Sequence, residues 1–249
     1  MNRSLSLLLL LGMTITVNAR EKTTDDRVAQ FGDAVQTRLA PLFVAAKVPY
    51  PPSKVTLIGL KEERELQLYA AGTNGQYRLI QSYPILAASG KLGPKLREGD
   101  QQVPEGLYRI ESLNPNSRFH LSLRVNYPNA DDRAHAKKEG RKNLGGDIMI
   151  HGNAVSIGCL AMGDPAAEEL FVLAARTGLR NINVILSPVD FRNGKIAKPL
   201  GNTPQWLDGL YETIKTELSK YEKKKASEPV HAGDGNTRAS ALALAQKID

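Results

Sequence analysis

The sequence has 249 residues, of which 41% are hydrophobic and 24% are charged; this composition is typical of a globular protein and excludes a wholly disordered chain. Lysine and arginine number 33 against 26 aspartate and glutamate residues, so the formal net charge is +7, which favours anionic partners without determining the fold. The single cysteine, Cys159, excludes an intrachain disulfide and a structural zinc site built mainly from thiolates.

The first predicted element is a secretory signal peptide over residues 1–19. Arg3 supplies a positive start, residues 5–17 carry no charge, and Ala19 ends a stretch of small residues that is typical of a cleavage site. The uncharged run is shorter than the ~20 residues that a membrane-spanning helix needs. This favours cleavage after Ala19 over an uncleaved anchor, and we expect an exported protein.

Residues 20–53 are predicted to form a helical amino-terminal extension. A helix is expected over 20–46, capped by Asp25 or Asp26, because apolar residues recur on one helical face. These apolar residues are Val28, Phe31, Val35, Leu39 and Leu42. Prolines at 49, 51 and 52 end the helix and form a stiff connector to the next region.

The central region, residues 54–188, is predicted to be mainly β with one or two helices. Apolar runs bounded by turn residues predict strands at 54–60, 65–71, 77–86, 107–111, 119–127, 147–150 and 183–186. A long loop is expected over 87–106. Helices are expected at 129–139, capped by Asn129, and at 164–175, capped by Asp164 and ended by Gly178. Because the strands cluster ahead of the helices, the pattern argues against a doubly wound α/β sheet.

The last part of the chain is predicted to be a helical carboxy-terminal extension over residues 189–225. An amphipathic helix is expected over 203–221, with Trp206, Leu210, Ile214 and Leu218 on its apolar face. From Glu222 the chain is charged and then rich in alanine, serine and glycine, which predicts a disordered tail over residues 226–249.

The strongest functional signal lies at residues 147–163, where His151 ends a predicted strand and Cys159 follows eight residues later. A cysteine is a useful nucleophile only as the thiolate, which a neighbouring imidazole can generate near neutral pH. Gly158 lets backbone N–H groups converge as an oxyanion hole requires, and the Ser156 hydroxyl can orient this turn. The residues predict a Cys–His acyl-transfer site, and the alternative for Cys159 is a buried, structural thiol.

These motifs resemble the YkuD-type L,D-transpeptidase family of bacterial cell-wall enzymes, whose signature is a strand ending in His-Gly followed by Ser/Thr-His-Gly-Cys. His151-Gly152 matches the first part, and residues 156–159 match the second at three of four positions. The stretch 93–100 and the following Pro-Glu-Gly at 104–106 also fit the family pattern.

Two positions depart from that pattern. Ile157 replaces the usual histidine before Gly-Cys, and Ala161 replaces the usual arginine or asparagine after the cysteine. Together with Arg118 and the segments 127–130 and 132–135, these departures resemble the YafK-like subgroup. That subgroup is implicated in hydrolysing the link between peptidoglycan and an outer-membrane lipoprotein.

The resemblance implies a mainly β, β-sandwich-like catalytic fold with flanking helices, located in the periplasm of a Gram-negative bacterium. It implies that Cys159 attacks the L-centre carbonyl of diaminopimelate in a stem peptide, with His151 as general acid and base. The backbone N–H groups near Gly158 and Cys159 stabilise the oxyanion, and Ser156 belongs to the same turn. No metal or organic cofactor is implied; the expected partners are peptidoglycan stem peptides and a lipoprotein linked to them.

Several other residues could contact the substrate. Arg97, Asp100 and Arg133 lie in segments that could line the cleft, and an arginine suits a carboxylate-bearing stem peptide; the alternative is loop-structuring salt bridges. His120 could contact the substrate or serve a structural role. A zinc site from His120, His151 and Cys159 lacks ligand spacing.

Three functions remain open from the sequence: a cysteine amidase that releases a lipoprotein, a transpeptidase that forms 3-3 crosslinks or attaches a lipoprotein, and a non-catalytic wall-binding module. The two departures from the family pattern favour hydrolysis. Thiol reactivity separates the third from the first two, because a non-catalytic module needs no reactive cysteine. Nucleic acid is not an expected partner, because basic and aromatic residues do not interleave.

Overall fold

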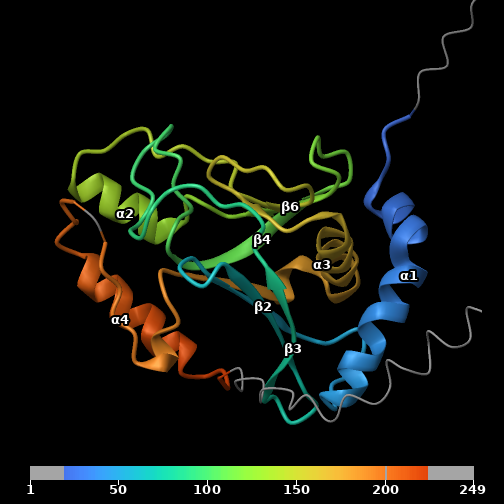
Figure 1. Ribbon diagram of the computed structural model, residues 1–249. Helices are drawn as coiled ribbons and strands as arrows, with labels where there is room; N and C mark the ends of the chain where they lie inside the picture. The colour runs from blue at the N-terminus through green and yellow to red at the C-terminus, as the bar shows by residue number, and fades with distance from the viewer. Residues whose placement is uncertain (1–19, 200, 224–249) are drawn as a thin grey trace, which may run out of the picture.

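A computed structural model describes residues 20–199 and 201–223 of the chain (Figure 1). The predicted signal peptide and the predicted disordered tail lie outside the described residues. Within them, no helix is both long and apolar enough to cross a lipid bilayer.

In the described part of the chain, eight strands form one mixed, curled sheet whose order is β3-β2-β1-β8-β4-β5-β6-β7. The strands are β1 Val55–Leu60, β2 Glu65–Ala71, β3 Tyr77–Pro84, β4 Gly106–Asn114, β5 Ser122–Val125, β6 Met149–His151, β7 Leu160–Ala161 and β8 Ile182–Ser187. Neighbouring strands run antiparallel, except that β1 pairs with β8 and β6 with β7 in parallel. The predicted mainly β fold with flanking helices is confirmed.

Four α-helices surround this sheet in the described residues: α1 Thr24–Ala45, α2 Ala130–Lys138, α3 Asp164–Thr177 and α4 Leu207–Leu218. Two short 3-10 helices, η1 Leu179–Asn181 and η2 Phe191–Asn193, flank β8. Figure 1 shows α1 and α3 side by side at one side of the sheet, with α4 and α2 at the other.

The sheet buries apolar side chains on both faces, as the alternation along β1 shows. Val55 and Leu57 belong to the main core, which also contains residues of α1 and α3, whereas Ile58 and Leu60 belong to a second cluster closed by Ile214 of α4. Successive side chains of a strand point to opposite faces, so a continuous apolar run indicates a strand covered on both sides.

Helix α1 is part of the main core, where its buried Val35, Leu39 and Phe43 pack. Its cap differs from the prediction. Thr23 is the N-cap and accepts from the backbone N–H of Asp26, whose side chain accepts in return from the Thr23 backbone. This reciprocal capping box satisfies two amide groups at once, which a cap at Asp25 or Asp26 would not.

Other boundaries also differ from the prediction. The strand expected at 119–127 is restricted to β5, because the chain at His120 has a positive φ of 71° that interrupts extended structure. Gly163, not Asp164, precedes α3, and the Asp164 carboxylate instead accepts from the Asn153 backbone N–H. Asn129 caps α2 and Gly178 ends α3, as predicted.

Candidate active site

A groove of about 260 Å³ opens where the end of β4, the loop after it and the edges of β5 and β6 meet. Nine residues line it: Asn114, Ser117, Arg118, Phe119, Ser122, Asp147, Met149, His151 and Cys159. The two residues predicted to carry the chemistry therefore face the same hollow. Strand β7 brings them together, because Ala161 pairs with His151 two residues after the cysteine.

The His151 side chain is held by the strand that carries it and is almost fully buried, at 2% exposure. Its Nδ1 lies 2.6 Å from the backbone oxygen of Gly152. An N–H on Nδ1 donates to this carbonyl, and that tautomer leaves Nε2 as a free base. Burial lowers the pKa of His151 below 6.5, which favours the neutral ring.

The thiol of Cys159 is partly buried, and its Sγ donates to the backbone oxygen of Asp147 at 3.4 Å. Burial is the main factor that raises the pKa of Cys159 above its usual range, and the negative charge of Asp147 acts in the same direction. Burial thus acts on both groups in the same sense, since it favours the neutral thiol of Cys159 and the neutral imidazole of His151.

The turn before the cysteine is fixed by two serine hydroxyls. The Ser156 Oγ accepts from the Cys159 N–H at 3.0 Å and donates to the Cys159 carbonyl at 2.6 Å. The Gly158 N–H donates to the Ser89 Oγ at 2.6 Å. The two N–H groups expected to form an oxyanion hole thus have hydroxyl acceptors, which a substrate oxygen would have to replace.

The four other predicted binding residues lie outside the groove. Asp100 organises the 87–105 loop: its carboxylate accepts from the Lys95 Nζ at 2.5 Å and from three backbone N–H groups. Arg97 is exposed on that loop and Arg133 is exposed on α2. His120 turns toward α3, where its Nε2 lies 3.0 Å from Glu168 Oε1.

The groove instead presents two charged residues that the sequence reasoning did not select as binding groups, Arg118 and Asp147. Asp147 adopts a positive φ of 54° and pairs with Arg124 of β5, whose Nη1 lies 2.9 Å from its carboxylate. Arg118 was visible in the sequence only as part of the family resemblance. The position of Asp147 depends on the pairing of β5 with β6, which the sequence does not show.

The same groove contains an aromatic contact that the sequence did not predict. The ring of Phe119 lies against the ring of His151, with centroids 4.8 Å apart and an interplanar angle of 32°. Among the described residues, no three His, Cys, Asp or Glu side chains are grouped so that they could hold a metal ion.

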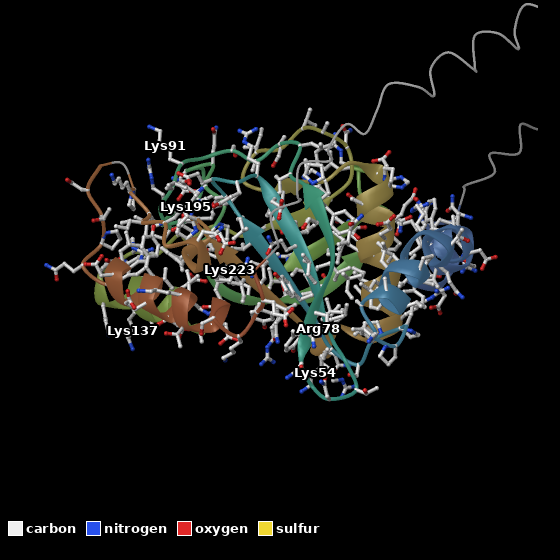
Figure 2. The ribbon with its side chains drawn as sticks, turned by 60° about the horizontal axis from the view of Figure 1, so that its bottom comes forward. Lys54, Arg78, Lys91, Lys137, Lys195 and Lys223 are labelled. Carbon is white, nitrogen blue, oxygen red and sulfur yellow. The ribbon has the colours of Figure 1, made fainter. Side chains whose placement is uncertain are left out.

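Several basic residues lie away from the groove. Figure 2 shows Lys54, Arg78, Lys195 and Lys223 spread between the β2–β3 hairpin and α4. Some of this charge is neutralised locally, since the Lys195 Nζ lies 2.8 Å from Glu62 and 2.9 Å from Glu63.

Comparison with known proteins adds family information to this geometry. A model of the L,D-transpeptidase catalytic domain, YkuD, matches residues 53–186. YafK, a candidate L,D-transpeptidase of Escherichia coli K12, is 46% identical over 113 residues, which cover 45% of this chain and 43% of YafK; its counterpart in strain O157:H7 gives the same values. The match therefore spans less than half of the length of these relatives.

Two solved structures share lower similarity. The helical cell shape determining protein Pgp2 of Campylobacter jejuni is 18% identical with a TM-score of 0.44, over 79% of this chain and 63% of Pgp2. Bd1075 of Bdellovibrio bacteriovorus is 20% identical with a TM-score of 0.41, over 70% of this chain and 58% of Bd1075.

Proposed function

Since the catalytic-domain model covers more than half of the chain, this protein belongs to the YkuD L,D-transpeptidase family, and we propose that it is a cysteine enzyme that cleaves the link between peptidoglycan and a lipoprotein. The observation that carries the proposal is the meeting of His151 and Cys159 in one groove. A buried imidazole whose pKa is lowered, in the same groove as a thiol, supplies the two groups that base-assisted nucleophilic attack requires.

In the proposed reaction, His151 Nε2 takes the proton of the Cys159 thiol, and Sγ attacks the L-centre carbonyl of diaminopimelate. The carbonyl oxygen becomes an oxyanion, which the Gly158 and Cys159 N–H groups stabilise once it has replaced the Ser89 and Ser156 hydroxyls. The carbon–nitrogen bond then breaks, and His151 returns its proton to the leaving amine. A thioester on Cys159 remains.

Water completes the reaction. His151 removes a proton from a water molecule as that water attacks the thioester carbonyl, and the Cys159 thiolate leaves and recovers the proton. The products are the stem peptide with a free carboxylate and the lipoprotein with a free lysine amine. An amine acceptor in place of water would give transpeptidation, the alternative function.

Two residues support hydrolysis over transfer. Ala161 is fully buried in β7, so the position where the family usually has arginine or asparagine offers a second stem peptide no polar group. Ile157 is 78% exposed and has an apolar side chain where the family usually has histidine. Both changes remove polar groups near Cys159 that could hold an acceptor.

The proposed location is the periplasm of a Gram-negative bacterium, with residues 1–19 removed. The net charge of +7 supports this proposal, since a positively charged protein is attracted to an anionic wall or membrane surface. Cell fractionation followed by sequencing of the amino terminus tests it, and a mature chain that starts at Arg20 in the periplasmic fraction is the expected result.

The activity is tested on purified sacculi that still carry covalently bound lipoprotein. The mature protein, its Cys159→Ala variant and a surface control, Val44→Ala, are incubated with the sacculi, and released protein and muropeptides are identified by mass spectrometry. We expect lipoprotein release by wild type and Val44→Ala only.

The other outcomes distinguish the alternatives. New 3-3 dimers, or loss of terminal D-alanine with exchange, would establish the transferase. Identical behaviour of wild type and Cys159→Ala would exclude cysteine catalysis and leave a wall-binding role.

A further inference from the structure

The loop that joins β4 to β5 supports His151 from two directions. Phe119 packs its ring on the imidazole, and the Leu121 carbonyl accepts from the Gly152 N–H at 3.1 Å. A Cβ added to Gly152 would lie 2.9 Å from the Phe119 carbonyl oxygen and 3.0 Å from the His120 Cβ. This loop therefore touches both the ring and the backbone of the proposed base, and its position sets the position of His151.

His120 lies near the end of this loop, two residues before β5, in an unfavourable backbone conformation. Its φ of 71° falls in the left-handed region, which non-glycine residues adopt only when their surroundings hold them there. The ring points away from the groove. Its Nε2 contacts Glu168 Oε1 of α3 at 3.0 Å, and Phe31 of α1 packs edge-on against it with ring centroids 5.3 Å apart.

Helix α1 also holds Glu168 itself. The second carboxylate oxygen of Glu168 accepts from Arg38 Nη2 at 3.3 Å. The Arg38 Nε donates to Glu169 at 2.5 Å, and the Glu169 carboxylate also accepts from the Tyr83 hydroxyl at 2.9 Å. The guanidinium thus orients two neighbouring carboxylates of α3, and one of them binds His120.

We propose that α1 positions the base of the active site, through Arg38, Glu168 and His120, by holding the β4–β5 loop against His151. This makes the three residues positioning residues and gives His120 a role other than contact with the substrate. The amino-terminal helix α1 then contributes to activity by fixing the position of His151. The proposal rests on the proposed role of His151 as general base.

A simpler explanation is that these contacts only attach α1 to α3. A second arginine at the same helix interface provides a matched control that separates the two explanations. Arg176 of α3 joins the same two helices, since its Nη1 donates to Gln36 of α1 at 3.1 Å and to the Tyr50 hydroxyl at 3.2 Å. These contacts do not include His120 or the β4–β5 loop. Arg38→Ala and Arg176→Ala therefore each remove one arginine from one helix interface, and only the first acts on His120.

The experiment compares the histidine ring resonances of wild type, Arg38→Ala, Glu168→Gln and Arg176→Ala by NMR, together with their melting temperatures. The sequence has four histidines, and a His151→Gln variant assigns the resonance of interest. We expect Arg38→Ala and Glu168→Gln to shift the His151 ring resonances, because the imidazole moves relative to the Phe119 ring. Arg176→Ala lowers the melting temperature by a similar amount without this shift.

The kinetic counterpart uses the sacculus assay. We expect Arg38→Ala, Glu168→Gln and His120→Ala to lower kcat by roughly 10- to 100-fold with little change in KM, as misplacement of a catalytic group does. His120→Gln retains an amide that can donate to Glu168 and recovers most of the rate. Arg176→Ala keeps the wild-type kcat.

Each result has a defined meaning. Unchanged His151 resonances in Glu168→Gln and Arg38→Ala, or equal shifts in Arg176→Ala, would overturn the proposal. If Arg38→Ala fails to fold, the isosteric Glu168→Gln decides the question by its His151 resonances, and the difference in kcat between His120→Ala and His120→Gln gives a second test. If wild type releases no lipoprotein while the selective NMR shifts persist, the proposed function fails but the structural link from α1 to His151 stands.

Discussion

At the scale of single residues, burial keeps both reactive groups of the active site uncharged. It raises the pKa of Cys159 and lowers that of His151, because a charged group loses hydration in a partly closed groove. Both shifts favour a neutral resting pair over a thiolate–imidazolium pair. In the proposed mechanism, the thiolate then forms only as His151 takes the thiol proton.

This predicts an alkylation profile for Cys159, the only thiol in the chain. Iodoacetamide reacts with the thiolate, so its rate with wild type should rise with a midpoint above the usual cysteine range. Mass spectrometry of the alkylated protein across a pH series measures this rate. A rate that stays constant from acidic to neutral pH would show a resting ion pair instead.

The rate of lipoprotein release should also depend on pH, through the protonation of His151 at acidic pH. His151 must be unprotonated to accept the thiol proton, and its lowered pKa keeps it unprotonated below pH 6.5. Lipoprotein release should therefore persist below pH 6.5 and fall only as the solution becomes more acidic. A loss of activity that begins above pH 6.5 would contradict the buried, neutral imidazole.

A second residue-scale prediction concerns Gly152. A Cβ at this position would lie 2.5 Å from the Asp164 Oδ1 and 2.9 Å from the Phe119 carbonyl, so Gly152→Ala should destabilise the fold by ~1–3 kcal/mol through overpacking and displace His151. Urea unfolding and the sacculus assay measure the two effects. Gly146→Ala is the control, because its nearest atom lies 4.0 Å away, and equal behaviour of both variants would refute the steric argument.

At the scale of elements, α1 is joined to the catalytic region by its apolar face as well as by Arg38. Leu39 is fully buried among sheet and α3 residues, whereas Val44 of the same helix is 76% exposed. Leu39→Ala should lower the free energy of unfolding by about 2–5 kcal/mol, and Val44→Ala by less than about 0.5 kcal/mol. Both changes should appear in urea unfolding.

The same experiment tests whether α1 unfolds with the sheet. For Leu39→Ala we expect a single unfolding transition, with the same midpoint by fluorescence and by circular dichroism, because the helix and the sheet share a core. A separate early transition, with a stable remainder, would show that the helix is an independent element.

At the scale of the whole molecule, a buried ionic network connects the sheet, the long loop and the carboxy-terminal helix. The Lys61 Nζ lies 2.9 Å from Glu105 Oε1, and the Tyr211 hydroxyl of α4 donates to Glu105 Oε2 at 2.8 Å. The Gly93 N–H of the loop donates to the same carboxylate at 2.7 Å. This network fixes one end of the 87–105 loop, whose Ser89 contacts Gly158 beside the cysteine.

Breaking this network should destabilise the whole fold. Glu105→Gln removes the carboxylate that pairs directly with the buried Lys61 ammonium, and the expected cost is about 3–5 kcal/mol. Thermal unfolding measures it. As a control, Glu212→Gln removes an exposed carboxylate from α4 and should leave the melting temperature unchanged. A similarly small change in melting temperature for both variants would show that the buried Lys61–Glu105 pair contributes little to stability.

Much of the fold and of the candidate site was predictable because the signals are local. The periodicity of apolar residues predicted α1 and α4, Asn129 predicted the start of α2, and Gly178 predicted the end of α3. The short spacing between His151 and Cys159 identified the pair that lines the groove. The prediction was less accurate at residues 119–121, where the apolar Phe119 and Leu121 suggested a strand but the backbone at His120 does not remain extended.

By itself, the amino-acid sequence determined the mainly β class, the flanking helices and the Cys–His motif, because hydrophobic period, capping residues and close spacing are properties of neighbouring residues. Only the tertiary structure decided which residues surround that motif. Pairing of β6 with β7 and of β5 with β6 placed Phe119 and Asp147 beside it, and packing of α1 on α3 gave His120 its partner. Those contacts join residues far apart in the chain, and their geometry depends on strand order and helix packing, which local sequence patterns do not encode.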